Sequence, residues 1–125
     1  MRRILVAEDD APSRELVRDI LELEGYEVIE AADGGEALMK IKELDLDLVL
    51  LDIRMPVLGG FAVLEQLRRE PKLSNLRVIA LTAYGMDDDR ARMFAAGFDA
   101  HASKPVDATK LKAQIKSFLD AQKAS

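Results

Sequence analysis

The residue whose position most clearly suggests chemistry is Asp52, a lone carboxylate at the end of an unbroken apolar run, 48–51. It is followed by Pro56 and by the pair Gly59-Gly60, which are turn-forming residues. An apolar run that ends in a charged residue and a turn is typical of a buried strand reaching the edge of a sheet, where α/β proteins bind ligands. We therefore expect Asp52 to be a functional carboxylate.

Two other segments place charged residues in a similar position. The acidic triplet Glu8-Asp9-Asp10 ends the apolar run 4–7, and Lys104 follows a weaker apolar run near the C-terminus. Carboxylates at strand ends are hard oxygen ligands for a divalent cation, and a lysine beside them can offset the charge of a phosphoryl group. Together these residue types indicate a site for a metal ion and a phosphoryl group.

The elements that position these residues follow from hydrophobic periodicity. Short apolar runs alternate with longer segments of helical period, which predicts an α/β fold of repeated βα units around a parallel sheet. The second and fifth strands carry polar residues and so belong at the sheet edges, which gives the order 2-1-3-4-5 of a flavodoxin-like, doubly wound (βα)5 domain. The strands are expected at 3–7, 27–31, 47–51, 77–81 and 99–103.

The segments between the strands show helix signals. The fourth helix offers mainly alanine to the core, so we expect it to be the least firmly anchored. The helices are expected from near Pro12 to before Gly25, from Asp33 with a capping-box Glu36, over 60–70, over 88–96 and after Asp107. Their expected inner-face residues are Leu16, Val17, Ile20, Leu21 and Leu23 in the first, Ala37, Leu38, Ile41 and Leu44 in the second, Phe61, Leu64 and Leu67 in the third, and Leu111, Ile115, Phe118 and Leu119 in the fifth.

Composition excludes several classes of protein. The 125 residues, 49% of them hydrophobic, suit one domain spanning 1–125, with 121–125 as a short C-terminal tail and no output domain. The net charge of -5 argues against nucleic-acid binding, and the absence of cysteine excludes disulfides and thiolate-bound metals. No apolar segment approaches the roughly 20 residues of a membrane span, so we expect a cytoplasmic protein.

The predicted strand order brings the acidic residues together. With strands one and three adjacent, Glu8 and Asp9 lie within a side chain's reach of Asp52. Carboxylates this close repel one another unless a cation or a proton lies between them, and Mg²⁺ is a cation that binds hard oxygen ligands. An alternative for Asp9 or Asp10 is that either simply caps the helix beginning near Pro12. Asp52 precedes no helix start, which favours the metal site.

At this point the chain resembles a known family, the CheY-like receiver domains of bacterial two-component response regulators. The likeness covers essentially the whole chain, and its motifs occur in the family's order and spacing. They are Ile-Leu-Val-Ala-Glu-Asp-Asp at 4–10, Leu-Leu-Asp-Ile-Arg-Met-Pro at 50–56 with Gly59-Gly60, Leu-Thr-Ala at 81–83, and Gly-Phe-Asp at 97–99 leading to Ser-Lys-Pro at 103–105.

The resemblance implies that Asp52 accepts a phosphoryl group from a histidine kinase or a histidine phosphotransfer protein. It also implies that Glu8, Asp9, Asp52 and the backbone carbonyl of Arg54 hold Mg²⁺, and that Lys104 supplies a second cation contact. The chain would then be a phosphoacceptor signalling domain rather than an enzyme, with its own self-phosphorylation and self-dephosphorylation chemistry.

Other residues match the family's switch and pocket positions. Thr82 corresponds to the switch hydroxyl, with an ordinary strand threonine as the alternative. Pro105 corresponds to a cis-proline that directs Lys104 into the site, with a plain turn proline as the alternative. Arg54, Ala83 and Tyr84 would flank the phosphoryl pocket.

One position departs from the family pattern, because His101 stands where Phe or Tyr is usual. The stretch around His101, followed by Lys-Pro-Val-Asp, resembles receivers of hybrid-kinase phosphorelays. A histidine is smaller and more polar than the usual ring, so the coupling of the switch to the surface is expected to differ. The alternative is a half-buried histidine with a backbone partner.

The sequence also bears on competing functions. Haloacid dehalogenase-like phosphatases need an acid where Arg54 stands, and a flavodoxin-like phosphate loop would be rich in Ser, Thr and Gly instead of acidic. A phosphorylation-independent binding scaffold and a receiver fragment of a hybrid histidine kinase remain alternatives. The signal is expected to leave through a protein partner at the fourth helix, fifth strand and fifth helix, from a monomer or a phosphorylation-dependent dimer.

The expected place of Tyr84 beside the phosphoryl pocket leads to a prediction. Replacing it with alanine would uncover the phosphoryl group to water, so Tyr84→Ala should lose its phosphoryl group faster than the wild type. Following the decay of phosphorylated protein by intact mass tests this, and an unchanged rate would remove the role of Tyr84.

Overall fold

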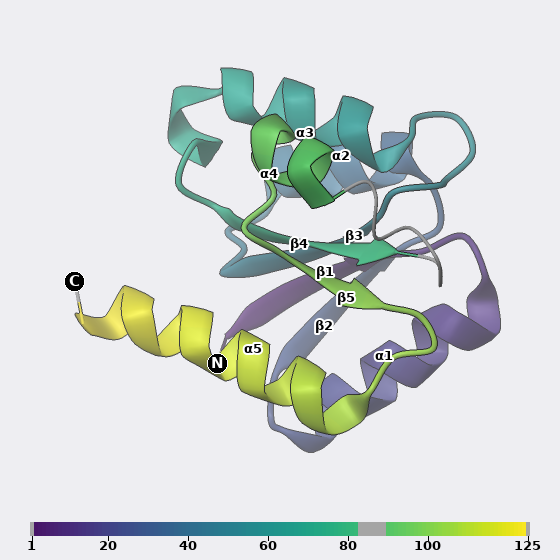
Figure 1. The fold of residues 1–125 in the computed structure, drawn as a ribbon, viewed down its shortest axis with the longest axis vertical. Coiled ribbons are helices and arrows are strands. Elements are labelled where there is room, and N and C mark those ends of the chain that lie inside the picture. The colour runs from purple at the N-terminus through teal and green to yellow at the C-terminus, as the bar shows by residue number, and fades with distance from the viewer. Residues whose placement is uncertain (1, 83–89, 125) are drawn as a thin grey trace.

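The computed structural model describes residues 2–82 and 90–124 and has a parallel sheet between two layers of helices (Figure 1). The sheet has five strands in the order β2-β1-β3-β4-β5, all parallel neighbours, which confirms the predicted order. The strands are β1 Arg3–Ala7, β2 Glu27–Ala31, β3 Leu48–Asp52, β4 Arg77–Thr82 and β5 Ala100–Ser103.

The helices cover both faces of the sheet. In Figure 1, α2, α3 and α4 lie over one face and α1 and α5 lie over the other. The last helix includes residues 121–124, most of the segment expected as a C-terminal tail. The helices are α1 Ala11–Leu23, α2 Gly34–Glu43, α3 Gly60–Arg69, a short 3-10 helix η1 Pro71–Leu73, α4 Arg90–Ala96 and α5 Ala108–Ala124. Within the described part of the chain, none of these helices has the length and apolar character of a membrane span.

The central strands divide the core into two layers. Alternate side chains of a strand point to opposite faces, so Leu5 and Val49 pack under α2 and α3, whereas Ile4 and Leu48 pack against α1 and α5. All four of these side chains are fully buried. Burial on both faces explains why the sequences of the central strands are continuously apolar. It also holds the ends of these strands in place.

Some expected details are wrong at the edges of elements. Leu16 and Leu23 are 51% and 88% exposed, because α1 buries only the narrow stripe that includes Val17 and Leu21. In α3, Phe61 packs against the core as expected, edge-to-face on Phe98 with ring centroids 5.7 Å apart, but the fully buried Val63 was not among the expected inner-face residues. Such shifts of one position on a helix face depend on helix rotation, which apolar spacing alone does not specify.

The loop after β3 is held by two close backbone approaches. Gly60 donates its N–H to the carbonyl of Ile53 at 2.8 Å, and a Cβ on Gly60 would lie 2.5 Å from the carbonyl oxygen of Asp52. A Cβ on Gly34, at the start of α2, would overlap the carbonyl oxygen of Leu58. Only glycine fits these two positions, so the loop folds back tightly and fixes the end of β3.

The neighbouring glycines of α2 give a matched pair of substitutions. Gly34→Ala should lower the free energy of unfolding by about 3 kcal/mol, because its methyl group meets backbone that cannot move aside. Gly35→Ala makes the same chemical change one residue later, where the nearest atoms lie 3.3 and 3.4 Å away, and should change stability by less than about 1 kcal/mol. Urea unfolding of both variants measures this, and equal losses would contradict the close packing at Gly34.

Candidate functional site

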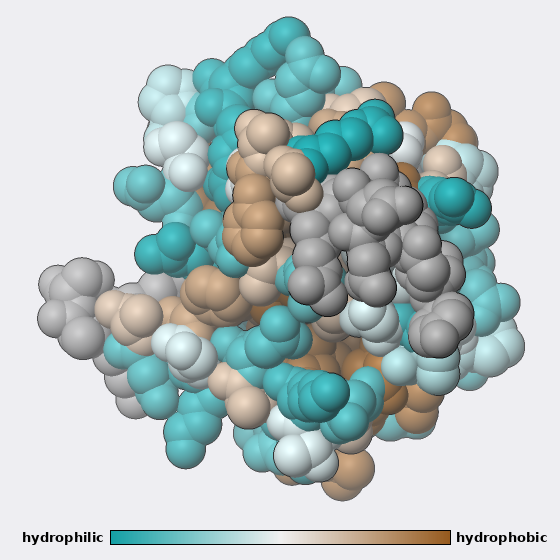
Figure 2. Space-filling model, in the orientation of Figure 1, coloured by the Kyte–Doolittle hydropathy of each residue, from teal (hydrophilic) through white to brown (hydrophobic). Residues whose placement is uncertain are grey.

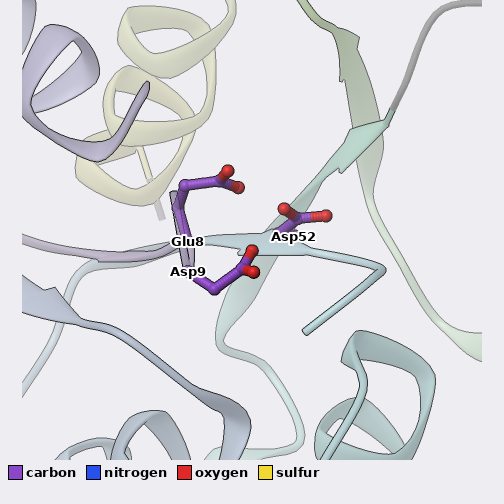
Figure 3. Close-up of side chains that lie close together, drawn as sticks. All are labelled: Glu8, Asp9 and Asp52. Atoms are coloured by element: carbon purple, nitrogen blue, oxygen red, sulfur yellow. The ribbon is translucent and has the colours of Figure 1, made fainter. Parts of the chain in front are cut away.

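Three carboxylates meet at the carboxyl ends of β1 and β3 (Figure 3). Ala7 and Leu51 are register partners in the two strands, so Glu8 and Asp9, which follow β1, come level with Asp52 at the end of β3. One oxygen from each carboxylate lies within 4.8 Å of the others. The parallel sheet thus brings together residues more than forty positions apart in the sequence, as the strand order predicted.

The third acid of the triplet has a different task. Asp10 caps α1, where its Oδ2 accepts hydrogen bonds from the Ser13 N–H at 3.1 Å and from the Ser13 hydroxyl at 2.6 Å. These hydrogen bonds hold the pKa of the Asp10 carboxyl below its usual range. Asp10 is therefore the capping residue, whereas the side chains of Asp9 and Glu8 lie close to that of Asp52.

A single ammonium group joins the two buried acids of the cluster. Lys104 Nζ lies 2.9 and 3.0 Å from the two carboxylate oxygens of Glu8 and 2.7 Å from Oδ2 of Asp52. The backbone of Lys104 is held as well, because its N–H donates to the carbonyl of Thr82 at 2.7 Å. The bond from Lys104 to Pro105 is cis. The ends of β1, β3 and β4 are thus linked through one lysine.

Burial shifts the pKa values of the charged groups in this cluster. Glu8 is 2% exposed and Asp52 is 4% exposed. Burial, and then contact with Asp52, raise the pKa of Glu8 to about 7 despite the nearby ammonium. Burial alone would lower the pKa of Lys104, but the two carboxylates outweigh it and raise that pKa. One ammonium does not neutralise three ionised carboxylates, so the cluster carries net negative charge when all three are ionised.

The donor set suits a hard divalent ion. Glu8, Asp9 and Asp52 offer only carboxylate oxygens, and the described residues contain no other such group of acidic or histidine side chains. The other oxygen of Asp52, Oδ1, accepts the backbone N–H of Arg54 at 2.9 Å, which fixes the plane of the carboxylate. The residues therefore fit Mg²⁺, with Asp52 oriented by the chain that follows it.

The remaining predicted residues lie at the neighbouring strand ends. Thr82 is buried at the end of β4, the strand next to β3, and pairs in register with Ser103. His101 is half-buried in β5 and alternates with Ala100 and Ala102, which pack toward α5, so its side chain belongs to the opposite face. The expected pocket residues Ala83 and Tyr84 lie outside the described residues.

Sequence reasoning missed one residue that contacts the acidic cluster. Arg14, in the first turn of α1, donates from Nη1 to the backbone carbonyl of Glu8 at 2.8 Å. The only signal in the sequence is a cation near a helix N-terminus, where the helix dipole disfavours positive charge. That signal is weak, because exposed arginines at such positions are common.

Comparison with known proteins places this arrangement in a family. The model of the response regulator receiver domain matches residues 4–116, nearly the whole chain. The chain belongs to the response regulator receiver domain family. Its sheet order is that of a CheY-like receiver, a signalling domain of two-component systems and not an enzyme of the usual kind.

Individual relatives agree with this membership. The chain is 36% identical to the polar-differentiation response regulator DivK of Brucella ovis over 118 residues, which cover 94% of this chain and 96% of DivK. It is 39% identical over 118 residues to the phosphate regulon transcriptional regulatory protein PhoB of Escherichia coli, covering 94% of this chain but 52% of PhoB. The chain therefore spans about half the length of some curated relatives that it matches.

A solved structure shows the same fold. The response regulator protein TrrA from Thermotoga maritima, crystallised in complex with Mg²⁺-BeF, superposes with a TM-score of 0.85. The sequences are 37% identical, and the match covers 95% of this chain and all of TrrA. The fold of the receiver family is thus shared along nearly the entire chain.

The bridging ammonium leads to a stability prediction. In Mg²⁺-free buffer at pH 8, Lys104→Met should lower the free energy of unfolding by about 2–3 kcal/mol, because two buried carboxylates lose their shared cation. Adding Asp52→Asn to that variant should recover part of the loss. Lys110→Met, a substitution of an exposed lysine, is the control. If Lys104→Met unfolds like this control, the ammonium does not hold the cluster together.

Proposed function

We propose that Asp52 accepts a phosphoryl group from the histidine of a kinase or phosphotransfer protein in a Mg²⁺-dependent reaction, and that the phosphorylated domain signals to a protein partner. The observation that carries this proposal is the position of Asp52, a buried carboxylate with an ammonium at 2.7 Å and two further carboxylates beside it. Membership of the receiver family supports the same proposal.

The residues around Asp52 prepare it as a nucleophile. The Arg54 N–H and the Lys104 ammonium each hold one of its oxygens, so the carboxylate is aligned before a donor arrives. In the transfer, a carboxylate oxygen forms a bond to phosphorus while the bond from phosphorus to the donor's imidazole nitrogen breaks. The electron pair of the broken bond leaves with the imidazole, and Asp52 becomes an acyl phosphate.

The acidic cluster is the proposed magnesium site. Glu8, Asp9 and Asp52 would hold Mg²⁺ together with the backbone carbonyl of Arg54. When bound, Mg²⁺ supplies positive charge that stabilises the phosphoryl oxygens during transfer. The complex of TrrA with Mg²⁺-BeF supports this assignment by likeness. Lys104, freed from Asp52 as the phosphoryl group arrives, would supply the second positive contact.

The output of the switch is proposed to pass through α4, β5 and α5. Thr82 is connected to the site through its carbonyl, which holds the Lys104 backbone, and His101 lies one strand further on. In the described part of α4 only Met93 is buried, whereas Phe94 is 58% exposed, and Figure 2 shows apolar residues at the surface over this helix. A helix with so few anchors can shift at little cost to meet a partner or a second copy of the domain.

A mass measurement tests the proposed reaction. Incubation with acetyl phosphate and Mg²⁺ should add one phosphoryl group to the protein, and the addition should fail in Asp52→Asn or in excess EDTA, because each removes a required group. Asp107→Asn, which alters an acid on a helix cap instead of in the site, is the matched control and should be labelled normally. Absence of label on the wild type would instead support a phosphorylation-independent scaffold.

A further inference from the structure

We propose that Arg14 is a positioning residue for magnesium binding, because it fixes the peptide that joins Glu8 to Asp9 by linking it to Glu30 of β2. The inference rests on the proposed function, since it assigns a role in the magnesium site described above. It concerns a residue that does not itself touch the ion or the phosphoryl group.

The contacts of Arg14 form a bridge between two strands. Its Nη1 donates to the backbone carbonyl of Glu8 at 2.8 Å, and its Nε donates to Oε1 of Glu30 at 3.2 Å. The Arg14 side chain is only 18% exposed and that of Glu30 is 32% exposed, so both are partly shielded from water. The planar guanidinium can satisfy both partners at once, which a point-charge ammonium cannot do with the same geometry.

This bridge completes the fixing of Glu8. The N–H of Glu8 donates to the carbonyl of Ala31 at 3.0 Å, and its carboxylate is held by Lys104. Arg14 holds the remaining polar group, the carbonyl. The orientation of that carbonyl is also the orientation of the next peptide N–H, and so it sets the direction in which Asp9 leaves the strand.

Asp9 is the acid that depends most on this direction. Among the described residues it has no hydrogen bond or ion pair of its own, and it is exposed, unlike Glu8 and Asp52. Within the part of the chain that the structure describes, its distance to the other two carboxylates is therefore set by the backbone, with no side-chain contact to hold it. A loosened Glu8 carbonyl would let Asp9 swing away and would remove one of the three predicted ligands.

Simple electrostatics predicts the opposite effect for Arg14. A positive charge near a cation site repels the cation, so loss of that charge should strengthen magnesium binding. Loss of a positioning contact should weaken it, as is usual when residues that orient metal ligands are replaced. The sign of the change in affinity therefore distinguishes a positioning role from a mere neighbouring charge.

The chain offers a close control in Arg18. It lies one turn later on α1 and its Nη1 reaches the other carboxylate oxygen of Glu30 at 3.4 Å, but it makes no contact with Glu8. Arg18→Gln thus removes the same charge from the same helix and from the same acidic partner. Arg14→Gln removes the charge and the bridge together, while Arg14→Lys keeps the charge and loses the planar fork.

The direct readout is the affinity for Mg²⁺, measured by calorimetric titration. Each variant must first show a native amide NMR spectrum. We expect Arg14→Gln and Arg14→Lys to bind Mg²⁺ about tenfold or more weakly than the wild type. Arg18→Gln should bind as tightly as the wild type or slightly more tightly. Phosphorylation by acetyl phosphate should need correspondingly more Mg²⁺ in the Arg14 variants and should approach the wild-type rate when Mg²⁺ is saturating.

Three outcomes would contradict the positioning role or the magnesium site itself. If Arg14→Gln binds Mg²⁺ as tightly as Arg18→Gln, the positioning role is wrong, although the magnesium site stands. If the wild type itself takes up no Mg²⁺, the proposed function fails before Arg14 is considered. A defect in Arg14→Lys that persists at saturating Mg²⁺ would also overturn the inference, because the bridge acts through metal affinity.

Discussion

Two buried carboxylates share one ammonium in this protein, and this contact ties the ends of β1 and β3 to the segment that follows β5. Glu8 and Asp52 would repel each other at the end of the sheet without Lys104, which lies within 3.0 Å of both. The same lysine closes the loop from β5 back onto β4. A change of charge at this cluster would therefore be felt at three strand ends at once.

The scaffold is rigid where the chemistry is expected and lightly anchored where a signal could leave. The central strands are buried on both faces, and the loop that carries Asp52 is folded back tightly at Gly34 and Gly60. By contrast, the described part of α4, Arg90–Ala96, buries only Met93 and leaves Phe94 exposed. In the proposed function, such a division would let a local change in charge shift a peripheral helix while Asp52 stays aligned.

The sequence was sufficient for the strand order and for the acidic cluster, because apolar runs and strand-end charges are local patterns. It was not sufficient for contacts that depend on helix rotation or on long-range packing. Leu23 matched the apolar period of α1 but is exposed, since the sheet covers only part of that helix face. The sequence placed Lys104 with the carboxylates but not its contact with Glu8, 96 positions away, and the contact of Arg14 with a backbone carbonyl has no signature in residue type.

The position of a bound ion would show whether Glu8, Asp9 and Asp52 form one metal site beside Lys104. Mn²⁺ favours the same oxygen ligands as Mg²⁺ and scatters anomalously, so crystals grown with it would show where the cation lies. We predict one strong anomalous peak among the carboxylate oxygens of Glu8, Asp9 and Asp52, with Lys104 still in contact with Glu8. A peak elsewhere, or none at saturating Mn²⁺, would contradict the account.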